Sequence, residues 1–588
     1  MSPKFALTWY KLPCMRLLSS PAPGSVSPDT TDRQIVLLGV LLTAIALTYF
    51  YAVDHYYFST RLMAPIFRFL LMMDDMKTGW LTLGVCLLAA CWRKPAPILK
   101  LVDFLSAHEI AVAAAAVASF ALGAIFIYHN NAFSMDEYAA VFQAKVFAAG
   151  RLTAPLPPSV LDWLIPPAFN GMFLVASHTT GQAMEGYWPG FALILAPFEF
   201  LGAPWLCNAV LAGIAIFLIH RITLEITSDR RAAGWAVLFT LGSGAFAANA
   251  ISYYSMQAHL TANLLFVWLL LKPTPYRAFG AGVVGSLALV LHNPFPHTLF
   301  ALPWIVAIAF SKERRRAFLP LILGYLPLTI LVGAGWLHLR ELVGGTSGGF
   351  NVIGNTLGGY FRLPGKPMID SCIAALVKMW IWAVPCLFLF AVLGRLRRGD
   401  DWRVRLLAQS AVLTFVGYVF FVFDQGHGWG YRYFHSAWGV VPILAGCAMV
   451  AQPESGARLT AFAGAAAILN LLLVVPYQMT QIDSIIAAHS AQLPKPRRPG
   501  NDVYFVGASG GFYLPDLVQM DPLLRAGDLI LLSRGSELDS ELRRQNWPAA
   551  TLADSTPAVE EWVSPEMPGT QQLHFGLSGA EITQPVVQ

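Results

Sequence analysis

Charged residues are scarce in this sequence. They make up 12% of its 588 residues, whereas 56% are hydrophobic and the mean hydropathy is +0.56. Soluble domains carry roughly 25% charged residues. The composition therefore excludes an ordinary soluble domain, and the many long apolar runs predict a polytopic α-helical membrane protein.

Three further absences narrow the class of protein. The seven cysteines are an odd number without metal-ligand spacing, so we expect core thiols. The turn 507–511 follows a predicted strand but lacks the lysine and the spacing of a phosphate loop. The net charge of +5 is spread over short clusters, and no basic stripe is interleaved with aromatic residues. We therefore expect no nucleic-acid partner and no nucleotide site.

About thirteen apolar segments are predicted to span the membrane. Several are shorter than the usual ~20 residues, so their boundaries are soft and one or two are candidates for re-entrant segments. The predicted spans are 34–53, 79–92, 108–128, 205–224, 231–250, 256–271, 277–292, 295–310, 317–337, 373–394, 406–423, 437–451 and 458–476.

The distribution of Lys and Arg predicts the orientation. With residues 1–33 in the cytoplasm, 22 of these residues lie in inside segments or at the inner ends of spans, and 9 lie in the outside loops between spans. This distribution agrees with the positive-inside rule. It places the loop 129–204 and the segment 477–588 outside. We therefore predict a multi-pass protein of the cytoplasmic (inner) membrane whose C-terminal segment lies on the periplasmic side.

The predicted spans and loops define four parts of the chain. Residues 1–33 form a cytoplasmic segment, 34–107 two additional N-terminal membrane helices, and 108–476 a membrane core with the outer loop 129–204. In 477–588 the patterns at 502–507 and 528–535 predict buried strands, and 537–545 predicts a helix. We expect a small α/β domain there, with a loose polar tail after about Pro557.

Two adjacent carboxylates, Asp136 and Glu137, follow the apolar segment that runs from His108 to Tyr128. A carboxylate at the bilayer centre costs roughly 2.5–3.5 kcal/mol on insertion scales, and less near the interface. The pair is therefore expected where a helix leaves the membrane, which is where a base must lie if its substrate hangs from a lipid. The alternative is that the two carboxylates only end the helix and face water.

Other polar residues are predicted on the same outer face. They lie in the turn 292–297 and in the Gly- and aromatic-rich segment 426–435, and they are His292, His297, His427, Tyr431, Arg432 and His435. The alternative for each histidine is an interfacial side chain satisfied by the backbone. The alternative for Arg432 is an interfacial anchor among aromatic residues.

Five stretches in this order resemble a known family. Asp-Glu-Tyr (136–138) opens the loop, "AKVFAAGRL" and "YWPGFALILAPFEFLGAP" follow, and "SDRRAAGWAVLFTLGSG" and "GHGWGYRYFHSAWGVVPILAG" come later. Together they resemble integral-membrane glycosyltransferases of the C-type (GT-C) fold, nearest to the dolichyl-phosphate-mannose protein mannosyltransferase and aminoarabinose transferase group. The likeness covers mainly residues 108–310 and 424–445.

The resemblance implies a site and a substrate. In that group the first outer loop carries the catalytic carboxylate and the sugar donor is a polyprenyl phosphate, which makes Asp136 the leading candidate base with Glu137 beside it. The two additional spans before His108 depart from the group. The histidines of the outer turns are not carried over from it, and they are candidates on physical grounds alone.

The predicted reaction is an inverting sugar transfer at the outer membrane face. A base takes the proton of an acceptor hydroxyl as it attacks the anomeric carbon. Arg432 suits the leaving phosphate because a guanidinium binds phosphate bidentately. Asp136, Glu137 and a histidine carry metal-ligating groups, but their spacing does not indicate a metal site, and no cofactor is predicted.

Several alternatives stay open. The acceptor is a glycan, a lipid or a protein, and the sugar is undetermined. A transporter or lipid flippase of the cell-envelope glycan pathway would also place charges on the outer face, although it should show inverted repeats and charges near the midplane. A non-enzymatic assembly protein would explain the external C-terminal segment, but it would not need a carboxylate pair at the lipid boundary.

Overall fold

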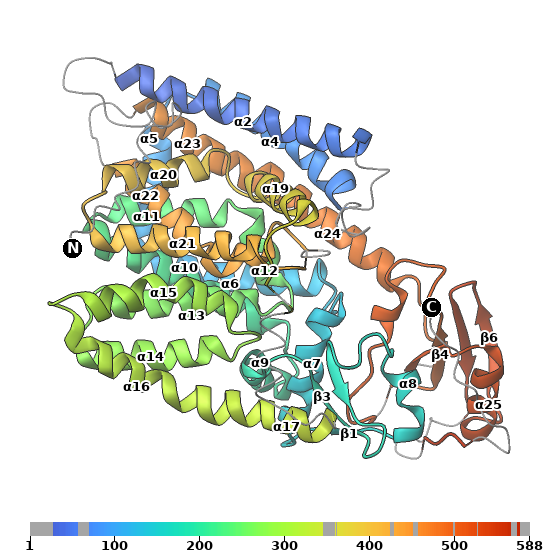
Figure 1. The fold of residues 1–588 in the computed structure, drawn as a ribbon. Helices are drawn as coiled ribbons and strands as arrows, with labels where there is room; N and C mark the ends of the chain where they lie inside the picture. Colours follow the sequence, from blue (N-terminus) through green and yellow to red (C-terminus); the bar gives the residue numbers. More distant parts are fainter. Residues whose placement is uncertain are drawn as a thin grey trace. The chain divides into compact units, whose positions relative to one another are not determined.

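The structure, a computed structural model, describes residues 28–56, 70–344, 359, 361–423, 428–450, 457–497, 500–525, 527–565 and 573–576. The chain divides into two compact units (Figure 1). The helical unit comprises Met1–Tyr128, Trp205–Gly333 and Phe350–Asp483. The loop unit comprises His129–Pro204, Ala334–Gly349 and Ser484–Gln588. The first outer loop and the C-terminal segment therefore belong to the same unit.

The helical unit is built from apolar helices joined by short turns. Its described helices are α2 (Pro28–Tyr56), α4 (Met76–Cys91), α5 (Ala96–Ala107), α6 (Glu109–Phe126), α10 (Leu206–Thr227), α11 (Arg230–Leu241), α12 (Gly244–Ile251), α13 (Met256–Leu270), α14 (Pro275–Leu289), α15 (Phe295–Phe310), α16 (Phe318–Leu328), α19 (Lys366–Ile381), α20 (Leu387–Arg397), α21 (Trp402–Val419), α22 (Val440–Val450) and α23 (Ala457–Leu469). The π-helices η2 (Leu71–Asp75), η5 (Thr329–Ala334) and η7 (Asn470–Val474) and the 3₁₀ helix η6 (Arg432–Ala437) connect some of them. Helix α24 (Val475–Ser490) follows η7.

These helices make the chain a multi-pass membrane protein. Among the described residues, five helical stretches are long and apolar enough to cross a membrane, and α11 with α12, bent by 66°, makes a sixth candidate. Four shorter apolar helices accompany them. The mostly helical fold with a small C-terminal sheet is confirmed, whereas the count of about thirteen spans stays a prediction.

Close helix crossings in this unit depend on glycine. Helices α14 and α16 pack against each other, and at their contact Gly282 faces Gly324. A Cβ at Gly282 would collide with the carbonyl oxygen of Leu321. Small residues let membrane helices approach until their backbones touch, which supplies the packing that the hydrophobic effect does not supply in lipid.

A buried ion pair ties the N-terminal helices to the rest of the helical unit. Lys378 of α19 lies 2.7 Å from the carboxylate of Asp75, and both side chains are 1% exposed. The indole of Trp382 donates to the same carboxylate at 2.6 Å. Lys378 also donates to the carbonyl of Gly428 at 3.4 Å. The segment before His108 therefore supports the start of the described segment that carries Arg432.

The loop unit contains two small sheets. After α7 (Met135–Ala148), strands β1 (Ala154–Pro155), β2 (Leu174–Ala176) and β3 (Gln182–Glu185) form an antiparallel sheet of order β1-β3-β2. The helices α8 (Leu161–Leu164), α9 (Gly190–Phe200) and α17 (Gly335–Gly344) belong to the same unit.

The C-terminal segment forms the second sheet. Strands β4 (Asp502–Val506), β5 (Leu529–Leu532), β6 (Thr551–Ser555) and β7 (Val559–Val563) have the order β5-β4-β7-β6, and α25 (Ser536–Asn546) lies between β5 and β6 in sequence. Strands β4 and β5 pair in parallel, whereas β4 with β7 and β7 with β6 pair antiparallel. The expectation of a loose tail after Pro557 is wrong for β7, because this strand pairs with β4 along its whole length and buries Val559 in the core of the sheet.

Polar contacts join α8 of the outer loop to the C-terminal segment. The indole of Trp163 donates to Asp539 at 2.8 Å. Asp162 lies 2.6 Å from the guanidinium of Arg534 and 2.9 Å from His178. These two partners lower the pKa of Asp162 against the opposing effect of burial, which is the largest single influence on it. The C-terminal sheet is therefore held on the outer loop by directed bonds.

Candidate active site

The first turn of α7 carries both predicted carboxylates, which have different surroundings. Carboxylates are favoured there by the positive end of the helix dipole. Glu137 is fully buried, and its Oε2 accepts a hydrogen bond from the backbone N–H of Phe133 at 3.0 Å. Ser134 and Glu137 have the spacing of a capping box, in which the acidic side chain reaches back to the start of the helix. Glu137 therefore stabilises the beginning of α7.

Asp136 is the half-buried carboxylate of the pair. Its Oδ1 accepts a hydrogen bond from the hydroxyl of Tyr187, a residue that follows β3. The carbonyl of Tyr187 accepts from the indole of Trp336 at 2.7 Å, and the carbonyl of Gly186 accepts from Arg340 at 2.7 Å. Helix α17 thus fixes the turn that presents the tyrosine, and the tyrosine orients the carboxylate.

A second aspartate meets α7 from the C-terminal segment. The Oδ1 of Asp516, in the 3₁₀ helix η8 (Leu514–Leu517), accepts from the backbone N–H of Met135 at 2.8 Å. The pKa of Asp516 is raised to about 7, mainly by burial; the hydrogen bond from the Met135 N–H lowers it, and the charge of Asp136 adds to the increase. The carboxyl of Asp516 therefore changes charge near neutral pH beside the candidate base.

Arg432 lies in the helical unit at the start of η6. Its side chain is buried, with the guanidinium carbon 4.8 Å from the ring centre of Tyr254 and 5.5 Å from that of Tyr433. The amide of Asn208 donates to the carbonyls of Ser252 and Tyr254 at 2.7 and 2.9 Å, which fixes the turn that presents Tyr254. The faces of aromatic rings attract a cation, which favours this position of the guanidinium.

The histidines predicted for substrate binding pack against polar side chains of the helical unit. His297 has Asn263 at 2.7 Å from Nδ1 and the hydroxyl of Tyr325 at 2.7 Å from Nε2. His435 has Gln257 at 3.1 Å from Nε2. These bonds give both histidines a role in packing α13 against α15 and η6. Their role in substrate binding stays a prediction.

The other described residues predicted for substrate binding lie in the turns before α15 and η6. His292 is half-buried in the turn between α14 and α15, within electrostatic range of His259. Tyr431 directly precedes η6. His427 lies outside the described residues. Asp136 and Glu137 belong to the loop unit and the other described candidates to the helical unit, so their convergence on one site stays a prediction.

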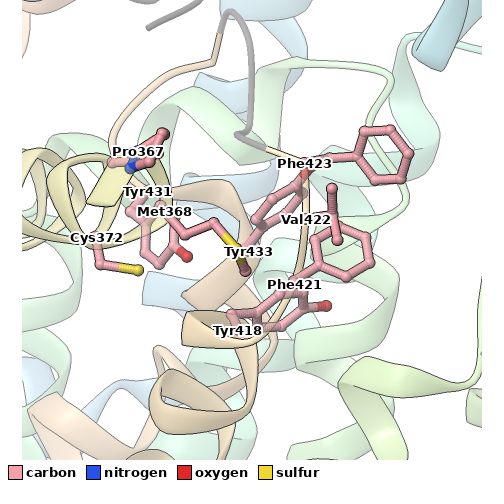
Figure 2. A pocket seen from close by; sticks show the side chains of 10 residues that line it. Pro367, Met368, Cys372, Tyr418, Phe421, Val422, Phe423, Tyr431 and Tyr433 are labelled. Carbon is pink, nitrogen blue, oxygen red and sulfur yellow. The ribbon is translucent and has the colours of Figure 1, made fainter. Parts of the chain in front are cut away.

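A small cavity lies beside Tyr431 in the helical unit (Figure 2). Its volume is about 90 Å³. Figure 2 shows Met368 and Cys372 of α19 together with the aromatic rings of the segment 418–433, and the full lining is Pro367, Met368, Ser371, Cys372, Tyr418, Phe421, Val422, Phe423, Tyr431 and Tyr433. Five of the ten lining residues are aromatic, and Ser371 and the tyrosines contribute hydroxyl groups.

Metal-ligating side chains are dispersed in the part of the chain that the structure describes. There, no three residues among His, Cys, Asp and Glu are grouped so that they could hold a metal ion. Asp136 and Glu137 instead accept hydrogen bonds from a tyrosine hydroxyl and a backbone N–H, respectively. This environment suits proton transfer by Asp136 and a structural role for Glu137.

Comparison with known proteins gives structural neighbours only. No protein-family model matches the sequence, and no curated protein matches it. The chain is similar to the crystal structure of ArnT from Cupriavidus metallidurans bound to undecaprenyl phosphate, with 11% identity and a TM-score of 0.49 over 77% of this chain and 97% of that chain. It is also similar to the apo structure of the same protein, with 12% identity and a TM-score of 0.44 over 73% and 92% of the two chains.

The neighbours come from the group that the sequence resemblance named. ArnT is an aminoarabinose transferase with the GT-C fold. At these identities and TM-scores the similarity assigns no activity to this chain. The function of this chain is therefore inferred from its own residues.

Sequence reasoning missed three residues of this site. Tyr187, Asp516 and Tyr254 contact Asp136, the start of α7 and Arg432, respectively. Tyr254 could have been noticed in the sequence, because the polar residues 252–255 interrupt an apolar stretch. No sequence pattern indicates Asp516, since its partner Met135 lies in a distant part of the sequence.

Proposed function

We propose that this protein is a membrane glycosyltransferase that moves a sugar from a polyprenyl phosphate to a hydroxyl acceptor at the outer face of the cytoplasmic membrane. The observation that carries the proposal is the environment of Asp136. It is a half-buried carboxylate that a tyrosine hydroxyl orients through Oδ1, and it lies shortly after the apolar helix α6. Such a group is suited to accept a proton beside a lipid surface.

In the proposed reaction Asp136 acts as general base. Its carboxylate takes the proton of the acceptor hydroxyl while that oxygen attacks the anomeric carbon of the sugar. The bond between the anomeric carbon and the phosphate oxygen breaks, and the polyprenyl phosphate leaves with the electron pair. The tyrosine hydroxyl at Oδ1 keeps the carboxylate in one orientation, which lowers the cost of reaching the reactive geometry.

Arg432 is the proposed partner of the leaving phosphate. A preorganised cation stabilises the charge that develops on a leaving group. The rings of Tyr254 and Tyr433 hold the guanidinium carbon within 5.5 Å, which favours a fixed orientation of the planar fork. A guanidinium in this state can bind two phosphate oxygens at once, which an ammonium cannot.

The proposed location follows from the distribution of charge. The inside segments are rich in Lys and Arg, and the loop 129–204 and the C-terminal segment fall on the other side. This supports a periplasmic position for the loop unit. The acceptor is then a glycan, a lipid or a protein that is accessible from the periplasm.

The donor separates this proposal from a transporter. We expect the purified protein to release undecaprenyl phosphate from undecaprenyl-phosphate-linked hexoses or pentoses in the presence of a membrane extract as acceptor source, measured by mass spectrometry. Nucleotide sugars should not support transfer. Arg432→Lys should lower the rate and Arg432→Ala should lower it more. Transfer from a nucleotide sugar, or a wild-type rate for Arg432→Ala, would contradict this account of the donor.

A further inference from the structure

The C-terminal segment packs against the start of α7 within the loop unit. The hydroxyl of Tyr138 donates to the carbonyl of Met520 at 2.6 Å, and it accepts from the N–H of Met520 at 2.9 Å. The amide of Gln519 donates to the carbonyl of Ala132 at 2.7 Å. Residues 519 and 520 therefore contact the chain on both sides of Asp136.

Aromatic contacts add to these bonds. The ring of Phe133 lies 6.3 Å from that of Tyr513 in a stacked arrangement and 5.0 Å from the imidazole of His489. The same imidazole lies 3.0 Å from the carbonyl of Tyr513. Phe133 is fully buried by this packing. The segment is thus fixed on α7 by side chains on both sides of η8.

Asp516 occupies the centre of this contact. It accepts the N–H of the first residue of α7, immediately before Asp136, and it is 8% exposed. The titratable side chains on α7 are Asp136, Glu137, Tyr138 and Lys145. His489 lies at the end of α24, and Tyr513 and Asp521 lie on the same segment as Asp516. Among them Asp136 is the one whose charge acts on Asp516.

We propose that Asp516 is a positioning residue for Asp136, through which the C-terminal segment fixes and tunes the base. The proposal rests on the function proposed above. In its ionised form Asp516 makes a charge-assisted hydrogen bond to the Met135 N–H, and such bonds are roughly twice as strong as neutral ones. Its negative charge also favours the uptake of a proton by a neighbouring carboxylate. Both effects strengthen the base when Asp516 loses its proton.

The proposed role of Asp516 predicts that the transfer rate increases in a step near neutral pH. Burial brings the pKa of Asp516 to about 7, so its charged form becomes populated within the working range of the enzyme. The rate should therefore rise as the pH increases through 7. Asn at this position keeps the shape and the accepting oxygen of the protonated acid, but it cannot acquire the charge.

The test measures release of undecaprenyl phosphate from undecaprenyl-phosphate-linked sugars between pH 5.5 and 8.5. We expect Asp516→Asn to match the wild type near pH 6 and to fall behind it by about threefold or more at pH 8, with its kcat affected and its KM unchanged. Asp521→Asn, a matched substitution on the same segment, should follow the wild-type profile. Tyr138→Phe should lower the rate at all pH values and keep the step.

The outcomes separate this inference from the proposed function. An active wild type with an inactive Asp136→Asn variant, together with an Asp516→Asn profile parallel to the wild type, would overturn the positioning role alone. A wild type that releases no undecaprenyl phosphate from any sugar would overturn the proposed function and this inference with it. Loss of the step in Tyr138→Phe would show that packing, and not the charge of Asp516, produces it, which also overturns the inference.

Discussion

At the scale of single residues, two neighbouring acids have different environments. Glu137 is fully buried and binds the backbone of Phe133, whereas Asp136 is half-buried and binds a tyrosine hydroxyl. The sequence alone pointed to Asp136 through a family resemblance. The spacing of Ser134 and Glu137 would have indicated the structural role of Glu137, because it is that of a capping box.

The buried carboxyl of Asp516 predicts a pH dependence of stability. Its folded pKa of about 7 lies above the ordinary value of 3.8. Between these values the folded protein holds a proton that the unfolded chain has lost, so stability falls as the pH rises from about 4 to 7. One pKa unit corresponds to about 1.4 kcal/mol, so this carboxyl alone accounts for a decrease on the order of 4 kcal/mol at most.

Asp516→Asn removes this titration. Its unfolding temperature in detergent should therefore decrease less than that of the wild type between pH 4 and 7, as followed by circular dichroism. Asp521→Asn serves as the control and should keep the wild-type dependence, because Asp516 is intact in it. An equal decrease in Asp516→Asn and in the wild type would show that the carboxyl does not change charge on unfolding.

At the scale of elements, most helices were predictable and most strands were not. The apolar runs located α6, α10, α13 and α15 within a few residues, because a membrane helix needs a long apolar stretch. The predicted span 373–394 is instead two helices, α19 and α20, because the chain turns at Trp382–Cys386, where Cys386 has φ 65°. The strands β1 to β3 left no signal, because two to four residues are too few to show an alternating pattern.

Glycine contacts between helices give a prediction at this scale. We expect Gly282→Ala to destabilise the protein, because the added Cβ would collide with the backbone of α16 at Leu321. Overpacking of this kind typically costs about 1–3 kcal/mol. The unfolding temperature in detergent is the measurement.

Gly84→Ala is the matched control for this substitution. Gly84 lies in α4, and a Cβ there meets no atom within 4 Å. Alanine is also the better helix former, by roughly 1 kcal/mol in water. The control should therefore be neutral or stabilising. Equal unfolding temperatures for the two variants would show that close approach at Gly282 is not required.

At the scale of the whole molecule, the C-terminal segment is part of the unit that carries the candidate base. The pattern of strands predicted within 477–588 indicated that this segment forms a small domain. It did not indicate what the segment packs on, because bonds such as Trp163 to Asp539 and Met135 to Asp516 join parts of the chain that are distant in sequence. Such long-range pairs leave no local pattern from which they could be predicted.

The central claim is that Asp136 is the base of a lipid-linked sugar transfer, and one rate comparison tests it most directly. Asp136→Asn keeps the shape of the side chain and removes its ability to accept the proton. General-base catalysis is typically worth 10²–10⁴-fold, so release of undecaprenyl phosphate from the lipid-linked sugar should fall by about that factor. Glu537→Gln, at an exposed position of α25 in the same unit, should retain the wild-type rate. A near-native rate for Asp136→Asn in protein that still folds and inserts would contradict the account.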